Sequence, residues 1–234
     1  MRPSLVHVVT EQILDRIAQS EFPPGSVLPS EGDLAKLMGA SRPTCREAVR
    51  ILCTQEVLRS VQGRGTFVNP VRRWISLDAI LRMHDANLLD AMIQLIEVRT
   101  LIEVGAAELF APLCREEHLE LMESDLEAMR STHMAEDVVA FVSADMAFHH
   151  RVLEGCGNPF ITATFRPITS ALQEGRIQTS SVPEIRTNAI AEHANIIVAL
   201  RTGSSERAGA AMRSHLEQTR RDAARHLVPL RRSA

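Results

Sequence analysis

Hydrophobic residues recur at helical spacing through most of the chain. Near the N-terminus, SLVHVVTEQILDRIAQSEF predicts an amphipathic helix that ends at the proline-rich segment FPPGSVLPS. From residue 88 onward the same period predicts only helices, with breaks such as GCGNP and RTGSS between them. Their approximate ranges are 88–112, 115–131, 136–155, 159–178, 183–201 and 204–226. The pattern therefore predicts a mainly α protein with a C-terminal bundle of about six helices.

Two shorter helices are predicted between the first helix and the bundle. Ser30 can cap SEGDLAKLM, Gly39 can end it, and after the joint GAS, Ser41 can cap a helix in SRPTCREAVRILCTQEV. Two short helices across a tight joint form a helix-turn-helix, whose second helix can lie in a DNA major groove. That helix is apolar on one side, and the other side carries Arg42, Arg46 and Arg50.

A β-hairpin is predicted directly after these helices. VLRSV and TFV are rich in strand-forming residues and flank the turn QGRG. Glycine allows close approach of the backbone to a duplex, and Arg64 at the tip can reach the minor groove or its phosphates. An arginine row alone is usually a solvated helix face, and a glycine turn is usually only a turn. Together, in this order, they favour a winged helix-turn-helix.

The N-terminal motifs resemble a known family. FPPGSVLPSEGDLAKLMGASRPTCREAVRILCTQEVL followed by GRGTFV is similar to the winged helix-turn-helix of GntR-family bacterial transcription regulators, over nearly all of residues 5–69. The resemblance implies double-stranded operator DNA as a partner, contacted by Arg42, Arg46 and Gly63, with Ser41, Thr44, Arg50 and Arg64 as helpers. Many relatives carry Arg where this chain has Gly32, so this protein is not expected to recognise the same operator sequences.

Charge and composition agree with a DNA-binding head on a helical body. Residues 1–74 hold 10 Lys and Arg against 7 Asp and Glu, whereas the remainder holds 16 against 22. Aromatic residues make up only 3%, and no Tyr occurs, which favours helices over a sheet sandwich. No apolar run approaches the ~20 residues of a membrane span, no secretory leader is evident, and the four Cys lack CxxC pairing. A cytoplasmic protein without a membrane partner is expected.

Polar residues interrupt apolar helix faces in the predicted bundle. Asp145 and His149 share one face with Phe141, Val142 and other apolar residues, and His193 and His215 lie on similar faces of two later helices. One carboxylate and three imidazoles suit a divalent transition metal. Alternatively, Asp145 pairs with a protonated His149 or with Arg99, and each buried His is satisfied by a carbonyl.

The second half also resembles a known domain. EVRTLIE, DMAFHHRVLEGCGNP, AEHANIIVAL and MRSHLE are similar to the FCD effector-binding domain of the FadR-type subfamily, over about residues 90–227. The resemblance implies a metal on Asp145, His149, His193 and His215, which in turn holds a carboxylate effector met by Arg99. Zinc is expected first, with nickel, manganese or iron as alternatives. Physically, Arg99 can equally pair with Glu103 on its own helix.

The expected function is a ligand-responsive DNA-binding regulator, a homodimeric repressor. Its parts would be a DNA-binding domain over 1–69, a connector over 70–87, and a metal-binding, effector-binding and dimerisation domain over 88–228. The connector WISLDAIL resembles that of relatives that respond to sugar acids such as galactonate or gluconate. Two alternatives stay open: a metal-dependent enzyme acting on a small organic acid, which lacks an identifiable general base, and a DNA-binding protein with a purely structural metal.

Overall fold

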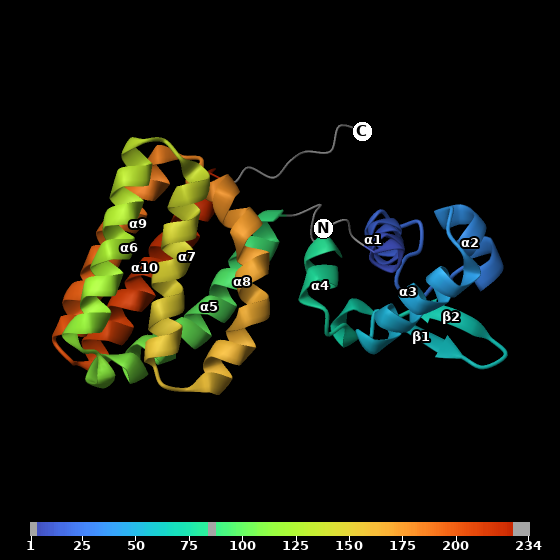
Figure 1. Cartoon of the computed structure of the whole chain (residues 1–234), viewed down its shortest axis with the longest axis horizontal. Coiled ribbons are helices and arrows are strands. Elements are labelled where there is room, and N and C mark those ends of the chain that lie inside the picture. Colours follow the sequence, from blue (N-terminus) through green and yellow to red (C-terminus); the bar gives the residue numbers. More distant parts are fainter. Residues whose placement is uncertain (1–3, 84–87, 227–234) are drawn as a thin grey trace. The chain divides into compact units, whose positions relative to one another are not determined.

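The computed structural model describes residues 4–83 and 88–226 of the chain. It divides into two compact units, Met1–Ala86 and Asn87–Ala234 (Figure 1). The first unit combines helices with one small sheet, and the second is helical throughout its described residues. The predicted fold class, a winged helix-turn-helix followed by an all-α bundle, is confirmed.

The N-terminal unit is built on three helices and a hairpin. Its elements are α1 (Leu5–Ala18), α2 (Glu31–Met38), α3 (Arg42–Thr54), β1 (Leu58–Val61), β2 (Gly65–Val68), the 3-10 turn η1 (Val71–Arg73) and α4 (Leu77–Met83). Ile13 and Ile17 from α1 join Leu34 from α2 and Leu52 from α3 in one buried cluster. Burial of these side chains fixes α3 with one face inward, so the opposite face is left exposed.

The predicted helix ends are confirmed. The Ser30 hydroxyl accepts a hydrogen bond from the Asp33 amide at the start of α2, and the Ser41 hydroxyl accepts one from the Thr44 amide at the start of α3. Gly39 ends α2 with φ 61°, a left-handed conformation that glycine adopts without steric cost. These local signals set the short joint that orients α3.

The hairpin wing is anchored to the proline-rich segment. β1 and β2 pair antiparallel, with Leu58 opposite Val68 and Val61 opposite Gly65. The Leu28 amide donates to the Thr66 carbonyl at 2.8 Å, and the Val68 amide donates to the Ser26 carbonyl at 2.9 Å. The segment after α1 therefore lies along β2 and holds the wing against the helices, a pairing that the sequence pattern did not predict.

The predicted connector, 70–87, is mostly part of the N-terminal unit. Trp74 is buried and its indole N–H donates to the Asn69 carbonyl at 2.9 Å. α4 packs against α1, where Arg82 forms ion pairs with Glu11 and Asp15. The chain is thus tied down to Met83, and the end of the predicted connector, 84–87, lies outside the described residues.

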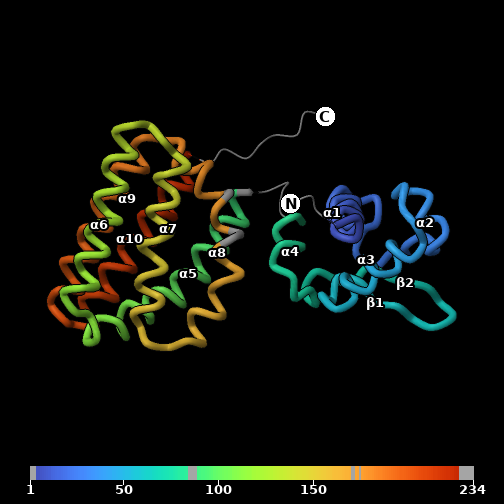
Figure 2. The backbone as a smooth tube through the Cα atoms, viewed as in Figure 1, coloured from blue at the N-terminus to red at the C-terminus, as the bar shows by residue number. Residues whose placement is uncertain are grey.

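The C-terminal unit is the predicted helical bundle. Its described helices are α5 (Leu88–Phe110), η3 (Ala111–Leu113), α6 (Glu116–Met134), α7 (Val138–Gly155), α8 (Pro159–Ser180), α9 (Pro183–Arg201) and α10 (Ser205–His226). They begin and end within three residues of the predicted ranges, and the predicted domain end at 228 lies outside the described residues. Figure 2 shows the path of the backbone through these helices.

Neighbouring helices converge on the middle of this bundle. α10 packs along α5 and α9, while α7 packs against α5, α6 and α8. Most of the facing side chains are apolar, but a group of buried polar side chains lies on α5, α7, α8, α9 and α10. The fold thereby gathers residues that are far apart in the sequence into one interior site.

Candidate functional site

All four predicted metal ligands are buried in the C-terminal unit. Asp145 and His149 lie one turn apart on α7, with His193 on α9 and His215 on α10. One nitrogen from each His lies within 4.8 Å of the others. The Asp145 Oδ1 atom lies 3.2 Å from His193 Nε2 and 3.8 Å from His149 Nε2. The structure therefore brings the four predicted residues to one place.

His149 is held in one orientation by a carboxylate. Its Nδ1 lies 2.5 Å from Glu103 Oε2, and since a carboxylate only accepts, Nδ1–H donates. The remaining nitrogen, Nε2, then carries a lone pair and receives a hydrogen bond from Arg99 at 3.1 Å. A carboxylate behind an imidazole is the arrangement that orients many metal-binding histidines.

On His193, a ring nitrogen that can only accept a hydrogen bond faces the Asp145 carboxylate, which also only accepts. Its Nδ1 donates to the Ala189 carbonyl at 2.7 Å, which leaves the lone pair on Nε2. That atom is buried, has no hydrogen-bond partner among the described residues, and faces the Asp145 carboxylate oxygen at 3.2 Å. Burial lowers the pKa of His193 well below its usual value, which favours the neutral ring. A shared cation would resolve this repulsion.

His215 completes the group with no partner of its own. Both of its ring nitrogens are buried and lack hydrogen bonds to the described residues. Its ring centroid lies 4.5 Å from that of His193 and 5.1 Å from that of His149. Burial, and then the neighbouring His193, lower the pKa of His215, which keeps the imidazole neutral and able to bind a metal.

Asp145 has a partner that the sequence analysis missed. Arg176 on α8 contacts Asp145 Oδ2, whereas His149, one of the two alternatives weighed there, lies farther away, with Nε2 3.8 Å from Oδ1. Arg176 is 7% exposed, and its Nε atom has no hydrogen-bond partner among the described residues. A signal was present, since Arg176 continues the buried stripe of Phe165, Ile168 and Leu172 along α8.

Arg99 forms the local pair that was the alternative to effector binding. Its Nε donates to Glu103 Oε1 at 2.6 Å, one turn along α5, and both side chains are 1% exposed. Burial raises the pKa of Glu103, but the charge of Arg99 and the His149 contacts outweigh it, so the net shift is downward. Glu103 is therefore an ionised, buried member of the site, and its contact with His149 was not foreseen.

The donor set fits a divalent cation. His149 and His193 each have Nδ1 hydrogen-bonded away from the centre, which leaves Nε2 for a metal, and His215 has two unused nitrogens. Asp145 can supply the hard oxygen ligand through Oδ1, which faces the histidines, while Oδ2 contacts Arg176. Bound there, an ion would act as a Lewis acid that attracts anionic ligands, and Arg99 and Arg176 would lie beside it.

Most of the predicted DNA-contacting residues are exposed on the N-terminal unit. Ser41, Arg42, Arg46 and Arg50 on α3 and its cap, and Gly63 and Arg64 on the wing, are exposed, while Thr44 is half-buried. Gly63 has φ 73°, so glycine meets a backbone requirement of the turn between β1 and β2. The arginines of α3 thus point away from the unit's core, as a groove-binding helix requires.

Acidic neighbours hold two of these arginines. Arg46 Nη2 lies 2.7 Å from Glu31 Oε2 on α2, and Arg50 Nη2 lies 2.6 Å from Glu47 Oε1 on its own helix. The hydrogen bonds from Arg46 lower the pKa of Glu31. These exposed pairs are weak, so a phosphate can compete for either guanidinium.

The unusual Gly32 lies beneath an arginine. A Cβ added at Gly32 would lie 3.2 Å from Arg42 Nη2, the mobile end of that side chain. The guanidinium of Arg42 therefore lies over the first turn of α2.

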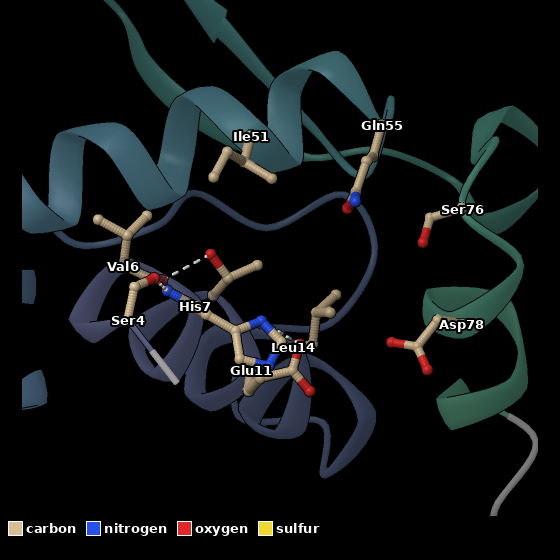
Figure 3. A pocket seen from close by; sticks show the side chains of 10 residues that line it. Ser4, Val6, His7, Glu11, Leu14, Ile51, Gln55, Ser76 and Asp78 are labelled. Atoms are coloured by element: carbon tan, nitrogen blue, oxygen red, sulfur yellow. Dashed lines mark hydrogen bonds and ion pairs between the residues drawn. The ribbon is translucent and has the colours of Figure 1, made fainter. Parts of the chain in front are cut away.

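A separate cavity of about 310 Å³ lies among α1, α3 and α4. Figure 3 shows His7, Gln55, Ser76 and Asp78 around this space, and the Gln55 amide oxygen is buried without a hydrogen-bond partner among the described residues. None of the predicted DNA-contacting residues lines it. It is therefore distinct from the exposed arginine face of α3.

These features define a class of protein. A winged helix-turn-helix with an exposed basic recognition helix is joined to a helical unit with a buried polar site. None of the described helices is long and apolar enough to cross a membrane. The combination is that of a DNA-binding transcriptional regulator with a small-molecule-binding domain.

The family follows from two matches. The family of bacterial regulatory proteins named gntR matches residues 5–68, and the FCD domain matches residues 94–218, which is more than half of the chain. The chain belongs to the GntR family of bacterial regulatory proteins, in its FadR-type subfamily with an FCD domain.

Several relatives are transcription regulators by name. The chain is 30% identical to the uncharacterized HTH-type transcriptional regulator YieP of Escherichia coli, over 68% of this chain and 71% of that protein. It is 32% identical to the E. coli galactonate operon transcriptional repressor, over 62% of this chain and 64% of the relative. LutR, an HTH-type transcriptional regulator of Bacillus subtilis, is 29% identical over 86% and 92%.

Solved structures agree on the fold. A Listeria monocytogenes protein, Lar, aligns with a TM-score of 0.68 at 22% identity and covers 96% of this chain and 99% of that one. Streptococcus agalactiae GntR aligns with a TM-score of 0.51 at 27% identity and covers 92% and 99%. Names of the family and the relatives thus indicate a regulator rather than an enzyme.

Proposed function

We propose that this regulator is a homodimeric, metal-dependent repressor whose affinity for operator DNA changes when a small carboxylate binds in the C-terminal unit. The metal ligands are Asp145, His149, His193 and His215, and Arg99 lies where it can meet the carboxylate. Zinc is the first candidate, and nickel, manganese and iron are the others. The proposed division of labour is DNA binding by 1–69, connection by 70–87 and sensing by 88–228.

One contact carries the proposal. The lone pair of His193 Nε2 faces a carboxylate oxygen of Asp145 at 3.2 Å in a buried position. Two facing acceptors are unfavourable unless a cation or a proton lies between them, and burial lowers the pKa of this imidazole. With the two unused nitrogens of His215 beside them, a metal ion is the simplest common partner.

The effector changes DNA binding because it has different affinities for the DNA-competent and DNA-incompetent arrangements of the dimer. Three imidazoles and one carboxylate leave positions open on a metal that prefers five or six ligands, so an organic acid can complete the coordination shell. For the acid to release DNA, it must bind the DNA-incompetent arrangement of the dimer more tightly. A sugar acid is a first test compound because one relative is named a galactonate operon repressor.

A dimer supplies the symmetry that a near-palindromic operator needs. Val98, Leu101 and Leu109 lie at helical spacing on the exposed face of α5, and Leu101 is 82% exposed. An apolar stripe of this kind favours burial against a second copy. Analytical ultracentrifugation of the wild type and of Leu101→Glu tests this part: two copies are expected for the wild type and a weaker dimer for the variant.

Elemental analysis and DNA binding together test the sensor. The purified wild type should hold about one divalent ion per chain, and His193→Ala should hold much less. Fluorescence anisotropy with labelled operator DNA then follows titration of small acids into the metal-loaded protein. Loss of DNA affinity in the wild type but not in His193→Ala supports the proposal.

Other outcomes would count against it. Metal-free wild-type protein that still responds to an acid would remove the metal from the sensor. A closed, four-coordinate zinc that no acid perturbs would make the metal structural. Steady turnover of an acid that stops in His193→Ala would instead indicate an enzyme.

A further inference from the structure

The interior site contains four ionised side chains in two pairs. Arg99 is paired with Glu103, with Nε and Oε1 2.6 Å apart, and Arg176 is paired with Asp145. All four are at least nine-tenths buried. Histidines that bind a metal do so as neutral imidazoles. Before any ion enters, the positive and negative charges of these four side chains are equal in number.

A divalent ion upsets this balance. It adds two positive charges to a buried region that has no spare anion among these four side chains. It would also share the single negative charge of Asp145 with Arg176, because Oδ1 faces the histidines while Oδ2 contacts Arg176. An arginine keeps its proton, so Arg176 cannot respond by becoming neutral, and a buried charge without a counter-ion is strongly unfavourable.

Arg176 and Arg99 are affected differently. Arg99 keeps Glu103 as its counter-ion whatever happens to Asp145, because that pair is local to α5. Arg176 shares the charge of Asp145 with the ion, and its Nε already lacks a hydrogen-bond partner among the described residues. The guanidinium of Arg176 is therefore the group that most needs a further anion when the ion shares Asp145.

We propose that the effector is a dianion, a small dicarboxylate, with one carboxylate completing the shell of the ion and the other paired with Arg176. The two negative charges of the dianion offset the two positive charges that a divalent ion adds to the buried site. The planar fork of Arg176, including its free Nε, suits bidentate contact with a carboxylate. This inference rests on the metal-dependent sensor proposed above and names the class of its effector and the residue that selects it.

A consequence is mutual dependence of the two ligands. The ion without the acid leaves an excess of positive charge beside Arg176, and the acid without the ion lacks the partner for its first carboxylate. The dicarboxylate should therefore raise the affinity for the ion by the same factor by which the ion raises the affinity for the dicarboxylate.

Matched pairs of acids test the number of carboxylates. The full-length protein is loaded with Co²⁺, whose absorption spectrum reports its ligands, and titrated calorimetrically with succinate or butanoate, and with galactarate or galactonate. Within each pair the carbon chains are equal and only the second carboxylate differs. At least one dicarboxylate should bind about tenfold or more tighter than its monocarboxylate partner and perturb the Co²⁺ spectrum.

Variants assign the second carboxylate to a residue. Arg176→Met should reduce dicarboxylate affinity to that of the matched monocarboxylate and leave the monocarboxylate unchanged, while Arg176→Lys should be intermediate. Arg130→Met, at an exposed arginine on α6, is the control and should change nothing. Circular dichroism and cobalt content show whether each variant is folded and loaded. If Arg176→Met is not, the comparison of matched acids on the wild type still tests whether the effector is a dicarboxylate.

The outcomes separate this inference from the function on which it rests. Wild-type protein that binds no Co²⁺, or His193→Ala that binds it equally well, contradicts the metal-dependent sensor. Bound Co²⁺ with equal affinity for both members of each pair contradicts only the dianion. An Arg176→Met variant that weakens both members equally removes Arg176 from selection.

Discussion

The buried pair of Arg99 and Glu103 permits a quantitative prediction about the C-terminal unit. Both side chains are 1% exposed and their closest atoms are 2.6 Å apart. Glu103→Gln keeps an oxygen that can accept from His149 but leaves Arg99 without a counter-charge, and Arg99→Met leaves the Glu103 carboxylate uncompensated. Breaking such a buried pair costs about 3 to 5 kcal/mol. With a urea m-value of about 2 kcal/mol/M, the midpoint should fall by about 2 M.

The double variant Arg99→Met/Glu103→Gln should recover much of this loss. No unpaired charge remains in it, so its cost should be smaller than the sum of the two single costs by about 2 to 3 kcal/mol. Urea unfolding is followed by circular dichroism in the presence of a chelator, so that metal binding does not mask the effect. Trp74, the single Trp of the chain, is buried in the N-terminal unit, and its fluorescence reports that unit separately.

An exposed pair provides the control for this cycle. Arg130 and Glu127 on α6 are 3.4 Å apart and 50% and 69% exposed. The matched substitutions Arg130→Met and Glu127→Gln should each change stability by less than about 1 kcal/mol. If the costs of the Arg99 and Glu103 variants simply add, or resemble those of the exposed pair, the reasoning from a buried, mutually dependent pair is refuted.

Three further predictions concern DNA and metal. Arg46→Ala should weaken binding to operator DNA and reduce the slope of log affinity against log salt by about 1, as measured by anisotropy; an unchanged slope would remove Arg46 from the interface. Gly32→Arg should do the reverse, because its Cβ meets the mobile end of Arg42 and its guanidinium brings a further cation to α2; unaltered DNA affinity would show that this position does not reach the duplex. His215→Ala should lose the metal and unfold at a lower temperature, and elemental analysis that finds full metal would refute His215 as a ligand.

Local signals allowed much of the fold to be predicted. The caps at Ser30, Gly39 and Ser41 depend on residues within one helical turn, so the sequence alone located the ends of α2 and α3. Apolar spacing likewise located the bundle helices to within three residues. α4 was missed because its short stretch lies after Trp74, where the apolar pattern is too brief to distinguish a helix from an ordered connector.

The chemistry of the interior site was only half predictable. The four proposed ligands stood out because each interrupts an apolar helix face, and the structure brings them together. Their partners depend on how helices pack. Arg176 meets Asp145 because α8 lies against α7, and Glu103 meets His149 because α5 lies against α7. No spacing along one helix encodes such contacts, although Arg176 did interrupt the apolar stripe of α8.

Arg99 and Arg176 provide a physical reason why the proposed metal site could bind and release its ion. Arg99 donates to His149 Nε2, an atom that an ion would need, and Arg176 contacts Oδ2 of Asp145, whose Oδ1 faces the histidines. The unit can therefore remain folded without the ion, in contrast to a structural zinc site, whose ligands have no other partners. Without the ion, the unfavourable features are the unpaired ring nitrogens of His215 and the two facing acceptors of His193 and Asp145. Binding of the proposed ion would replace the hydrogen bond from Arg99 to His149, and the two arginines beside the ion would then be available to an anion.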